Sequence, residues 1–314
     1  MVIHSSNEQK KFFNSNKKIM YFKNKNKLII LNYLFSLSLI LLNPIKATKE
    51  GLLFKDSYIV FQMKKKGSIK LFNTLGRNDC KTLTLPNIIK LDELNYSDIN
   101  YNYTINNSED KEKEIILIWN DNNLPKSTNC LFQECSDITE INFSNFDTSQ
   151  VTSMIRMFFK CSSLISLDLS TFNTSNANSM AALFTNCISL ESLNLSMLDT
   201  SKVTDMSNMF DNCKSLKSLD LSKFNTGNVK YLNYIFQKCS SLEYLDLSSF
   251  NTSNVLSMYS MFSNCKSLKS LNLSNFHTSK VKSMGYMFCN CSELMNLDIS
   301  NFNTSSVTNM KNMF

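Results

Sequence analysis

The sequence predicts an α/β solenoid of seven 26-residue units behind a small β-rich N-terminal cap. Cysteine recurs every 26 residues from Cys135 to Cys291, and phenylalanine recurs with the same step from Phe158 to Phe314. The hydrophobic pattern also changes period within each unit, from steps of two to steps of three and four. A unit this short cannot bury its own apolar side chains, so we expect the units to stack and share one core.

The front half of each unit predicts a short strand. In the unit 161–186, Leu164, Leu167 and Leu169 follow the L-x-x-L-x-L spacing that is typical of a leucine-rich repeat. Apolar and polar residues alternate from Leu167 to Ser170, as they do on a half-buried strand. Strands from successive units would pair about 4.8 Å apart in a parallel sheet.

The rear half of each unit predicts a helix. In the third unit, steps of three and four residues place one apolar stripe on a helix, formed by Val203, Met206, Met209, Phe210 and Cys213. A threonine stands in the turn before this stripe, where its hydroxyl can accept a bond from the free N–H groups that open a helix. Each unit is therefore expected to form strand, turn and helix.

The segment before the repeats predicts the cap. Residues 58–63 and 69–72 flank a turn, which is the pattern of a hairpin, and residues 115–119 predict another strand. The polar, Asn-rich segment 95–114 predicts a loop. The chain is thus divided into a leader at 1–47, the β-rich cap at 48–134 and seven repeats at 135–314, the last one incomplete.

The net charge of +7 belongs to the leader. Residues 1–47 carry eight lysines and one glutamate, while the rest of the chain carries 25 basic and 25 acidic residues. The body has no basic stripe, which argues against nucleic-acid binding. The apolar run 28–42 follows several lysines and leads to Ala47, which indicates a signal peptide cleaved there or an uncleaved signal anchor. We expect an extracellular or cell-surface protein that uses the secretory route.

The last repeat stops at Phe314 after 24 of its 26 residues, without a polar capping unit. We therefore expect the sequence to be a fragment of a longer protein or a truncated gene product. Membrane contact is expected only through the leader or through a missing C-terminal anchor.

The cysteines in register allow three interpretations. They lack the C-x-x-C pairing of zinc sites. Neighbouring strands would bring them about 5 Å apart, which overlaps disulfide geometry, but an odd column cannot pair completely. The favoured interpretation is a column of buried thiols. Cys80, Cys130 and Cys289 are better disulfide candidates, with Cys130–Cys135 and Cys289–Cys291 as possible but strained local pairs.

Two columns on the strand face are candidates for ligand binding. One is Asp or Asn in every unit, and the other varies from unit to unit, which is where specificity can be encoded. The same positions suit ordinary solvated strand residues, and the acidic column could also suit calcium. The candidate binding surface consists of Ile165, Asp168, Glu191, Lys217, Asp220, Glu243, Asp246, Lys269, Met295 and Asp298.

Sequons of the form N-x-[ST] are frequent, largely because the repeat is rich in Asn, Ser and Thr. In an exported eukaryotic protein they are possible acceptors of N-linked glycans. The candidate acceptors are Asn95, Asn102, Asn106, Asn173 and Asn251.

No arrangement of residues predicts catalysis. The two histidines are His4 in the leader and His277 in a turn, and the chain contains no Ser–His–acid set, phosphate loop or paired metal motif. The methionines at helical spacing are more typical of a core than of a metal box. We therefore expect neither an enzyme nor a cofactor or metal site.

The repeat pattern resembles the BspA-type leucine-rich repeat surface proteins. Their motif, L-x-x-L-[DN]-L-S-x-F-[DN]-T-S-x-V-x-x-M-x-x-M-F-x-x-C, stands here as KSLDLSKFNTGNV at 217–229 and FNTSSVTNMKNMF at 302–314, and the resemblance covers 130–314. Family members are found on bacterial and protist surfaces, and studied ones are adhesins for host matrix or plasma proteins.

This resemblance implies an exported protein that binds an extracellular protein or cell-surface ligand through its repeat surface. The alternative is a structural or self-assembling surface coat component without a dedicated ligand.

Overall fold

The computed structural model describes residues 12–14, 17–19, 23–24, 27–28, 56–63, 67–74, 76–91, 94–101, 103–108 and 113–314. The chain forms two compact units, 1–52 and 53–314. The first contains two antiparallel strand pairs, β1 (Phe12–Asn14) with β2 (Lys17–Ile19) and β3 (Lys23–Asn24) with β4 (Lys27–Leu28). Most of the predicted signal run, its cleavage point at Ala47 and the sequon at Asn102 lie outside the described residues.

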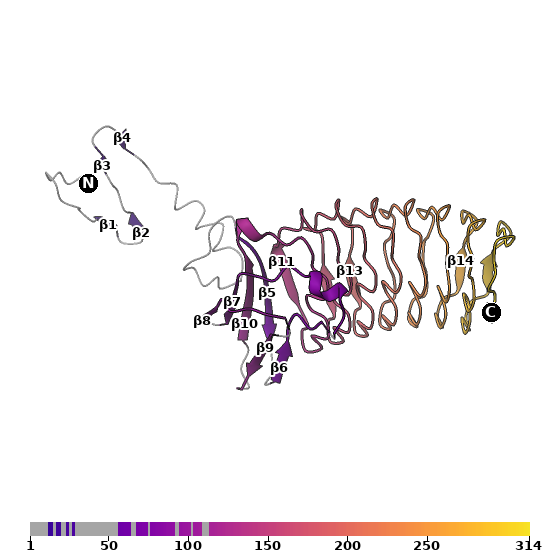
Figure 1. The fold of residues 1–314 in the computed structure, drawn as a ribbon, viewed down its shortest axis with the longest axis horizontal. Helices are drawn as coiled ribbons and strands as arrows, with labels where there is room; N and C mark the ends of the chain where they lie inside the picture. The colour runs from indigo at the N-terminus through magenta and orange to yellow at the C-terminus, as the bar shows by residue number, and fades with distance from the viewer. Residues whose placement is uncertain are drawn as a thin grey trace. The chain divides into compact units, whose positions relative to one another are not determined.

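The second unit begins with a five-stranded antiparallel sheet in the order β11-β5-β10-β7-β8, beside a two-stranded sheet of β6 and β9 (Figure 1). Its central strand is β10, whose residues 115–119 are all buried. The strands are β5 (Ser57–Met63), β6 (Gly67–Lys70), β7 (Ile88–Leu91), β8 (Leu94–Tyr96), β9 (Thr104–Asn107), β10 (Lys113–Trp119) and β11 (Ile141–Asn145).

The predicted hairpin in this region is wrong. β5 pairs with β10 and β11, while β6 pairs with β9. β10 is apolar on both faces, as is typical of a strand in the middle of a sheet with neighbours on both edges. β5 is one of these neighbours, and it contributes the buried side chains of Ile59 and Phe61. The segment predicted as one polar loop contains β8 and β9 and meets the start of β10, so that prediction is also wrong.

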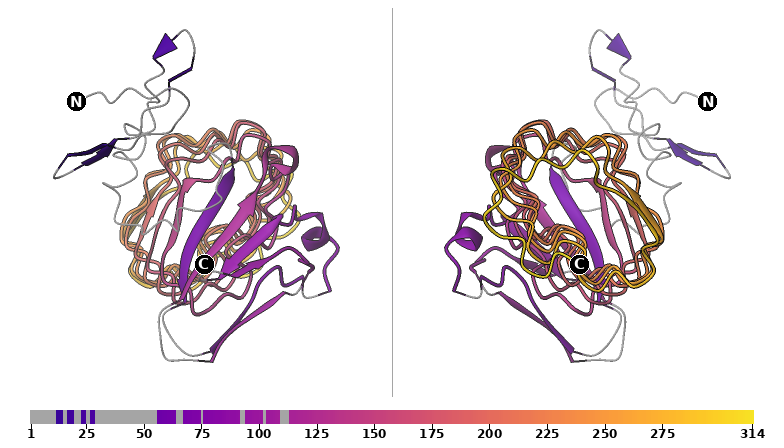
Figure 2. Two further views of the ribbon diagram at one scale, coloured as in Figure 1. Left: turned by 90° about the vertical axis from the view of Figure 1, so that its left-hand side faces the viewer. Right: turned by 90° about the vertical axis from the view of Figure 1, so that its right-hand side faces the viewer.

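The repeats form a stack of 26-residue coils that follows the cap sheet (Figure 1) and superposes when viewed end-on (Figure 2). Backbone groups bond from one coil to the next: the N–H of Phe210 donates to the carbonyl of Ile235 at 2.9 Å. One parallel bridge per step runs without interruption from Ser127 to Asn309. The ladder already includes Phe132, whose N–H donates to Met157 at 2.8 Å, so the cap passes into a half-coil before the first full one.

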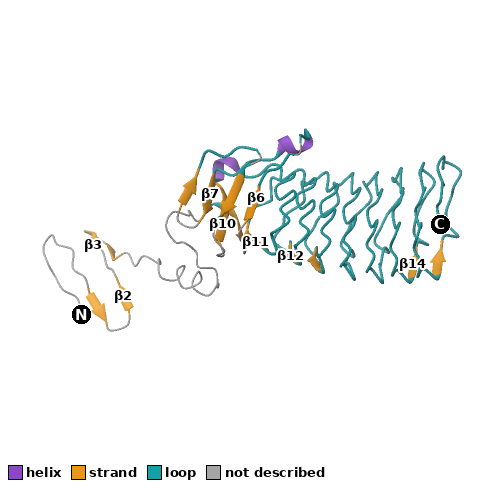
Figure 3. Cartoon of the chain, turned by 90° about the horizontal axis from the view of Figure 1, so that it is seen from below, coloured by secondary structure: helices purple, strands orange, loops and turns teal. Residues whose placement is uncertain are grey.

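The front of the coils carries short parallel strands. β12 pairs with β13, and β14 pairs with β15, in each case with equivalent residues of neighbouring coils opposite one another. These strands lie along one edge of the stack (Figure 3). Their bounds are β12 (Ser166–Asp168), β13 (Ser192–Asn194), β14 (Ser270–Asn272) and β15 (Asn296–Asp298).

The predicted α/β class is wrong, because the rear halves of the coils are not helical. The helices of the described residues are two 3₁₀ turns in the cap, Asp79–Thr82 and Asp121–Asn123 (Figure 3). The class that the structure supports is nearly all-β, with short strands and turns, rather than units of strand, turn and helix.

Hydrogen bonding explains this difference. In the segment 206–213, the N–H groups of Met209, Asp211 and Cys213 donate to carbonyls three residues back. The alternate N–H groups donate to the next coil, as that of Asn208 does to Asn233 at 2.8 Å. Asn208 and Asn212 also have positive φ, of 61° and 62°, which is incompatible with a right-handed helix. The apolar residues of this segment therefore recur at steps of three and four because the segment consists of consecutive turns, not because it is a helix.

The interior of the stack is a set of side-chain columns. The phenylalanine rings stack nearly parallel, with centroids 5.6–5.9 Å apart, through Phe132, Phe158, Phe184, Phe210, Phe236, Phe262, Phe288 and Phe314. Beside them, the buried Cys213 thiol donates to the carbonyl of Phe184 at 3.2 Å, and the equivalent contact recurs in successive coils. Burying each of the rings from Phe132 to Phe288 contributes roughly 1.5–3 kcal/mol, so the columns stabilise the stack as a whole.

Candidate functional site

The front of the stack presents one continuous surface, which we call the strand face. It is formed by residues 165–168, 191–194, 217–220, 243–246, 269–272 and 295–298. The third residue of each segment is a leucine that turns inward, and the others point toward solvent. All ten predicted surface residues lie here. Glu243 is half-buried, and the exposed ones are Ile165, Asp168, Glu191, Lys217, Asp220, Asp246, Lys269, Met295 and Asp298.

The acidic column of this face has a local structural role. The Oδ1 atom of Asp220 accepts the N–H of Ser222 at 3.0 Å, and Asp246 does the same for Ser248 at 2.9 Å. Asparagines make the same bond in other coils, as Asn272 does with Ser274. Hydrogen bonds from the serine two residues on lower the pKa of Asp220 and Asp246. The column therefore holds the turn after each strand, and these bonds favour the ionised form of Asp220 and Asp246.

The variable column contains a braced cluster. Lys269 Nζ lies 2.8 Å from Glu243 Oε2, and this hydrogen bond is the main cause that lowers the pKa of Glu243 and raises that of Lys269. The same ammonium lies 5.7 Å from the ring centroid of Tyr244. Tyr244 is 61% exposed. An exposed aromatic side chain thus stands on the face, with the Lys269 ammonium over its ring and the Glu243 carboxylate bound to that ammonium.

Sequence reasoning missed Tyr244. Its position is serine in four other coils, at Ser166, Ser192, Ser218 and Ser270. The signal was therefore present as the single large residue in a column of small ones. The predicted binding surface contains residues from the columns on either side but none from this column.

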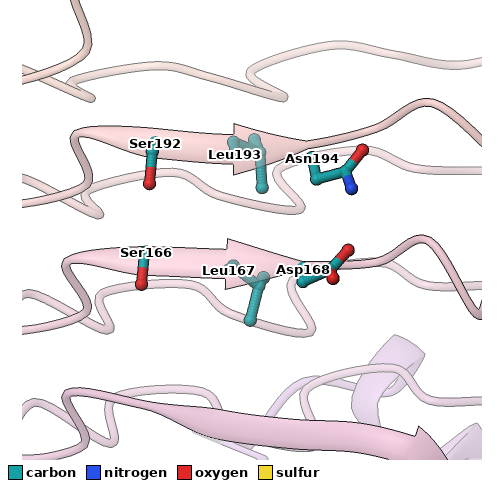
Figure 4. Close-up of a pocket in the computed structure, with 6 residues that line it drawn as sticks. All are labelled: Ser166, Leu167, Asp168, Ser192, Leu193 and Asn194. Carbon is teal, nitrogen blue, oxygen red and sulfur yellow. The ribbon is translucent and has the colours of Figure 1, made fainter.

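The strand face is open rather than hollowed. A shallow depression lies across β12 and β13, where equivalent side chains stand in line on the two strands (Figure 4). It is lined by Ser166, Leu167, Asp168, Ser192, Leu193 and Asn194, and a second depression lies across β14 and β15. Such a surface can contact a partner over several coils, and its chemistry is hydrogen bonding, ion pairing and apolar contact.

The cysteines divide into one disulfide and a thiol column. Cys80 bonds to Cys130, so two of the three predicted candidates are paired with each other, whereas the third, Cys289, is a free thiol. The predicted local pairs Cys130–Cys135 and Cys289–Cys291 are wrong, because Cys135, Cys289 and Cys291 are free thiols. Burial raises the pKa of the column's thiols, to about 12 for Cys187 and about 11 for Cys291. The column of buried thiols is confirmed for the six cysteines from Cys135 to Cys265, while the seventh, Cys291, is partly exposed.

The described sequons are accessible. Asn95 lies on β8 and Asn106 on β9, both exposed, although a loop was expected there. Asn173 and Asn251 are exposed in turns, where Oδ1 accepts the N–H of the residue two positions on, at 3.1 Å in both cases. These four side chains can be reached from solvent, which is a requirement for modification.

Other site types are not found in the described part of the chain. It contains no group of three or more His, Cys, Asp and Glu side chains arranged to hold a metal ion. Within the same residues, no helix has the length and apolar character needed to cross a bilayer.

Together, the stacked coils and the strand face define a repeat protein with an extended, open contact surface. A family model described as "Mycoplasma protein of unknown function, DUF285" matches four overlapping stretches, 99–214, 126–243, 184–292 and 212–314. The chain therefore belongs to this family of repeat-containing proteins. No curated protein and no solved structure matches it.

Proposed function

We propose that this chain is an exported BspA-type surface protein that binds an extracellular protein ligand through its strand face. The observation that carries the proposal is the contrast between columns. Inward positions repeat almost unchanged from coil to coil, whereas the exposed series Ile165, Glu191, Lys217, Glu243, Lys269 and Met295 differs at nearly every step. Packing requires the first set to be uniform and places no such demand on the second. Variation at exposed positions on a regular frame is what selective binding needs.

Two features support export. The leader has the pattern of a secretory signal. The Cys80–Cys130 disulfide joins residues 50 positions apart, and such bonds persist mainly in oxidising compartments. The BspA-type motif at 130–314 supports adhesion as the purpose of the binding, with a matrix or plasma protein as ligand. Catalysis forms no part of the proposal.

The test compares the native chain with a triple charge-reversal variant, Lys217→Glu, Glu243→Lys and Lys269→Glu. Binding to immobilised fibronectin, laminin and fibrinogen is measured by biolayer interferometry. The control is Lys230→Glu, an exposed site away from the strand face that lowers the net charge by the same amount. We expect the triple variant to lose at least tenfold in affinity for the protein that the native chain binds, while the control keeps its affinity.

Equal binding by the triple variant would remove this patch as the ligand site. Analytical ultracentrifugation of the same samples examines the alternative. Concentration-dependent polymers, together with no binding to any of the three proteins, would favour a self-assembling coat component.

A further inference from the structure

Tyr244 is the feature of the strand face that packing does not explain. Its backbone neighbour Leu245 is buried and fills the core position, while the tyrosine ring itself is 61% exposed. The equivalent residues in the coils before and after are Ser218 and Ser270. The ring therefore rises from a floor of small side chains, and a serine at this point would serve the coil equally well.

The ring is held in position. Lys269, from the following coil, places its Nζ 5.7 Å from the ring centroid and 2.8 Å from the Glu243 carboxylate. The lysine thus contacts the carboxylate and the ring at the same time. An aromatic side chain that is already ordered loses little conformational freedom when a partner covers it. Exposed, preorganised tyrosines are frequent energetic centres of protein interfaces.

The surroundings define the chemistry of the partner. Asp246 follows Tyr244 by two residues on the strand face, and Asp220 is its equivalent in the preceding coil, whereas Lys269 belongs to the following coil. Each aspartate has one carboxylate oxygen bonded to a backbone N–H. Both are exposed, and their charges repel each other between adjacent coils. No ion pair within 4.0 Å joins either carboxylate to a described side chain. Basic groups on a partner would complement this side of the ring.

We propose that Tyr244 is the specificity-determining anchor of the strand face, inserting into an apolar recess of a folded protein ligand whose rim carries basic groups. The proposal rests on the proposed function and names its partner class. Tyr244 acts by direct contact, Lys269 with Glu243 positions its ring, and Asp220 with Asp246 orients the basic rim.

The experiment replaces Tyr244 by serine, the residue of four equivalent positions, so the coil is expected to fold unchanged. The matched control is Met197→Ser, since Met197 is 60% exposed and stands where other coils have polar residues. Affinity for immobilised fibronectin, laminin and fibrinogen is measured alongside the melting temperature. We expect Tyr244→Ser to bind about 30-fold or more weakly. Tyr244→Phe and Met197→Ser should stay within about threefold of the native chain, with all melting temperatures equal.

A second variant tests the basic rim. Asp220→Asn with Asp246→Asn removes both charges but keeps the bond to the serine N–H, because asparagine makes that bond in other coils. We expect weaker binding and a smaller loss of affinity as salt is raised. Unchanged affinity and salt dependence would overturn the basic rim.

The outcomes separate the two proposals. If the native chain binds and Tyr244→Ser binds equally well, the anchor is overturned and the proposed function stands. If the native chain binds none of the three proteins, both are overturned.

Discussion

At the scale of single residues, the hydroxyl groups of the buried threonines take the place of backbone-to-backbone hydrogen bonds where the coil turns. Thr226 Oγ1 donates to the carbonyl of Asn251 at 2.9 Å and accepts the N–H of the same residue at 2.8 Å. In the sequence this column predicts helix caps, because a threonine before an apolar stripe is typical of a cap. The hydroxyl instead links two coils. The position was predicted correctly, and its partner was not.

Replacing Thr226 by valine keeps the volume and removes both bonds. The backbone N–H and carbonyl of Asn251 then lose the hydroxyl of the fully buried Thr226 as their partner, so we expect a loss of about 1–3 kcal/mol in the free energy of unfolding. Urea denaturation measures it. Thr204→Val is the control, because Thr204 is exposed and its hydroxyl makes one longer bond, at 3.3 Å. Equal effects at both sites would contradict the role of the buried hydroxyl.

Asp211 opposes folding at neutral pH. Its Oδ1 atom is buried without a hydrogen-bond partner, and burial raises the pKa of this carboxyl despite the Asn208 amide and Lys238 nearby. A carboxyl whose pKa is higher in the folded than in the unfolded protein destabilises the fold when ionised. That penalty disappears as the pH falls below the unfolded value of about 3.9.

We therefore expect Asp211→Asn to raise the free energy of unfolding at pH 7 by up to about 1 kcal/mol, and to have little effect at about pH 3. Denaturation at both pH values measures the difference. Asp220→Asn is the comparison, because hydrogen bonds lower the pKa of that carboxyl and its loss cannot stabilise the protein in this way. A gain that is the same at both pH values would show that charge is not the cause.

At the scale of elements, the rear segment of each coil depends on two residues with left-handed backbone. Lys238 is one of them, with φ of 57°, and its equivalents Asn212 and Asn264 have φ of 62° and 63°. Asparagine tolerates this conformation better than most residues, and a β-branched residue tolerates it poorly. Asparagine is frequent at this position in the sequence, but the helix was predicted from the spacing of the apolar residues alone.

Substitutions at Lys238 test this backbone without disturbing the core, because the side chain is exposed. We expect Lys238→Val to cost about 1–2 kcal/mol and Lys238→Asn to be neutral or slightly stabilising, as measured by chemical denaturation. If valine is tolerated as well as asparagine, the left-handed turn is not what the position requires.

At the scale of the whole molecule, the coils share one core closed on its N-terminal side by the cap. The Cys80–Cys130 disulfide joins the first 3₁₀ turn of the cap to the half-coil. An ion pair between Asp79 and Arg156 ties the same turn to the first full coil. The thiol column runs through the interior of the coils that follow the cap. Thiol reactivity therefore reports on the integrity of the entire stack.

Alkylation of the unreduced protein with iodoacetamide at pH 8 should label Cys289 first, because it is half-exposed and because burial raises the pKa of the other partly exposed thiol, Cys291, to about 11. The buried thiols should react only after unfolding, when eight alkyl groups in total are expected. The disulfide pair should react only after reduction. Intact-mass spectrometry counts the groups. Six or fewer after unfolding would mean that further cysteines are paired and that the thiol column is wrong.

The sequence by itself determined the number of coils, the side chains that face inward, the positions exposed on the strand face and the burial of the cysteine column. These follow from burial, which leaves a repeated pattern in the side chains. Only the tertiary structure decided which groups bond. The alternate N–H groups of 206–213 donate to carbonyls 25 residues away in the next coil rather than within their own segment, and β5 pairs with β10 rather than with β6. The same holds for Cys80 with Cys130, and for Lys269 with Glu243 and Tyr244. A hydrogen bond or an ion pair depends on where two distant parts of the chain meet, and the periodicity of the side chains does not show which parts meet.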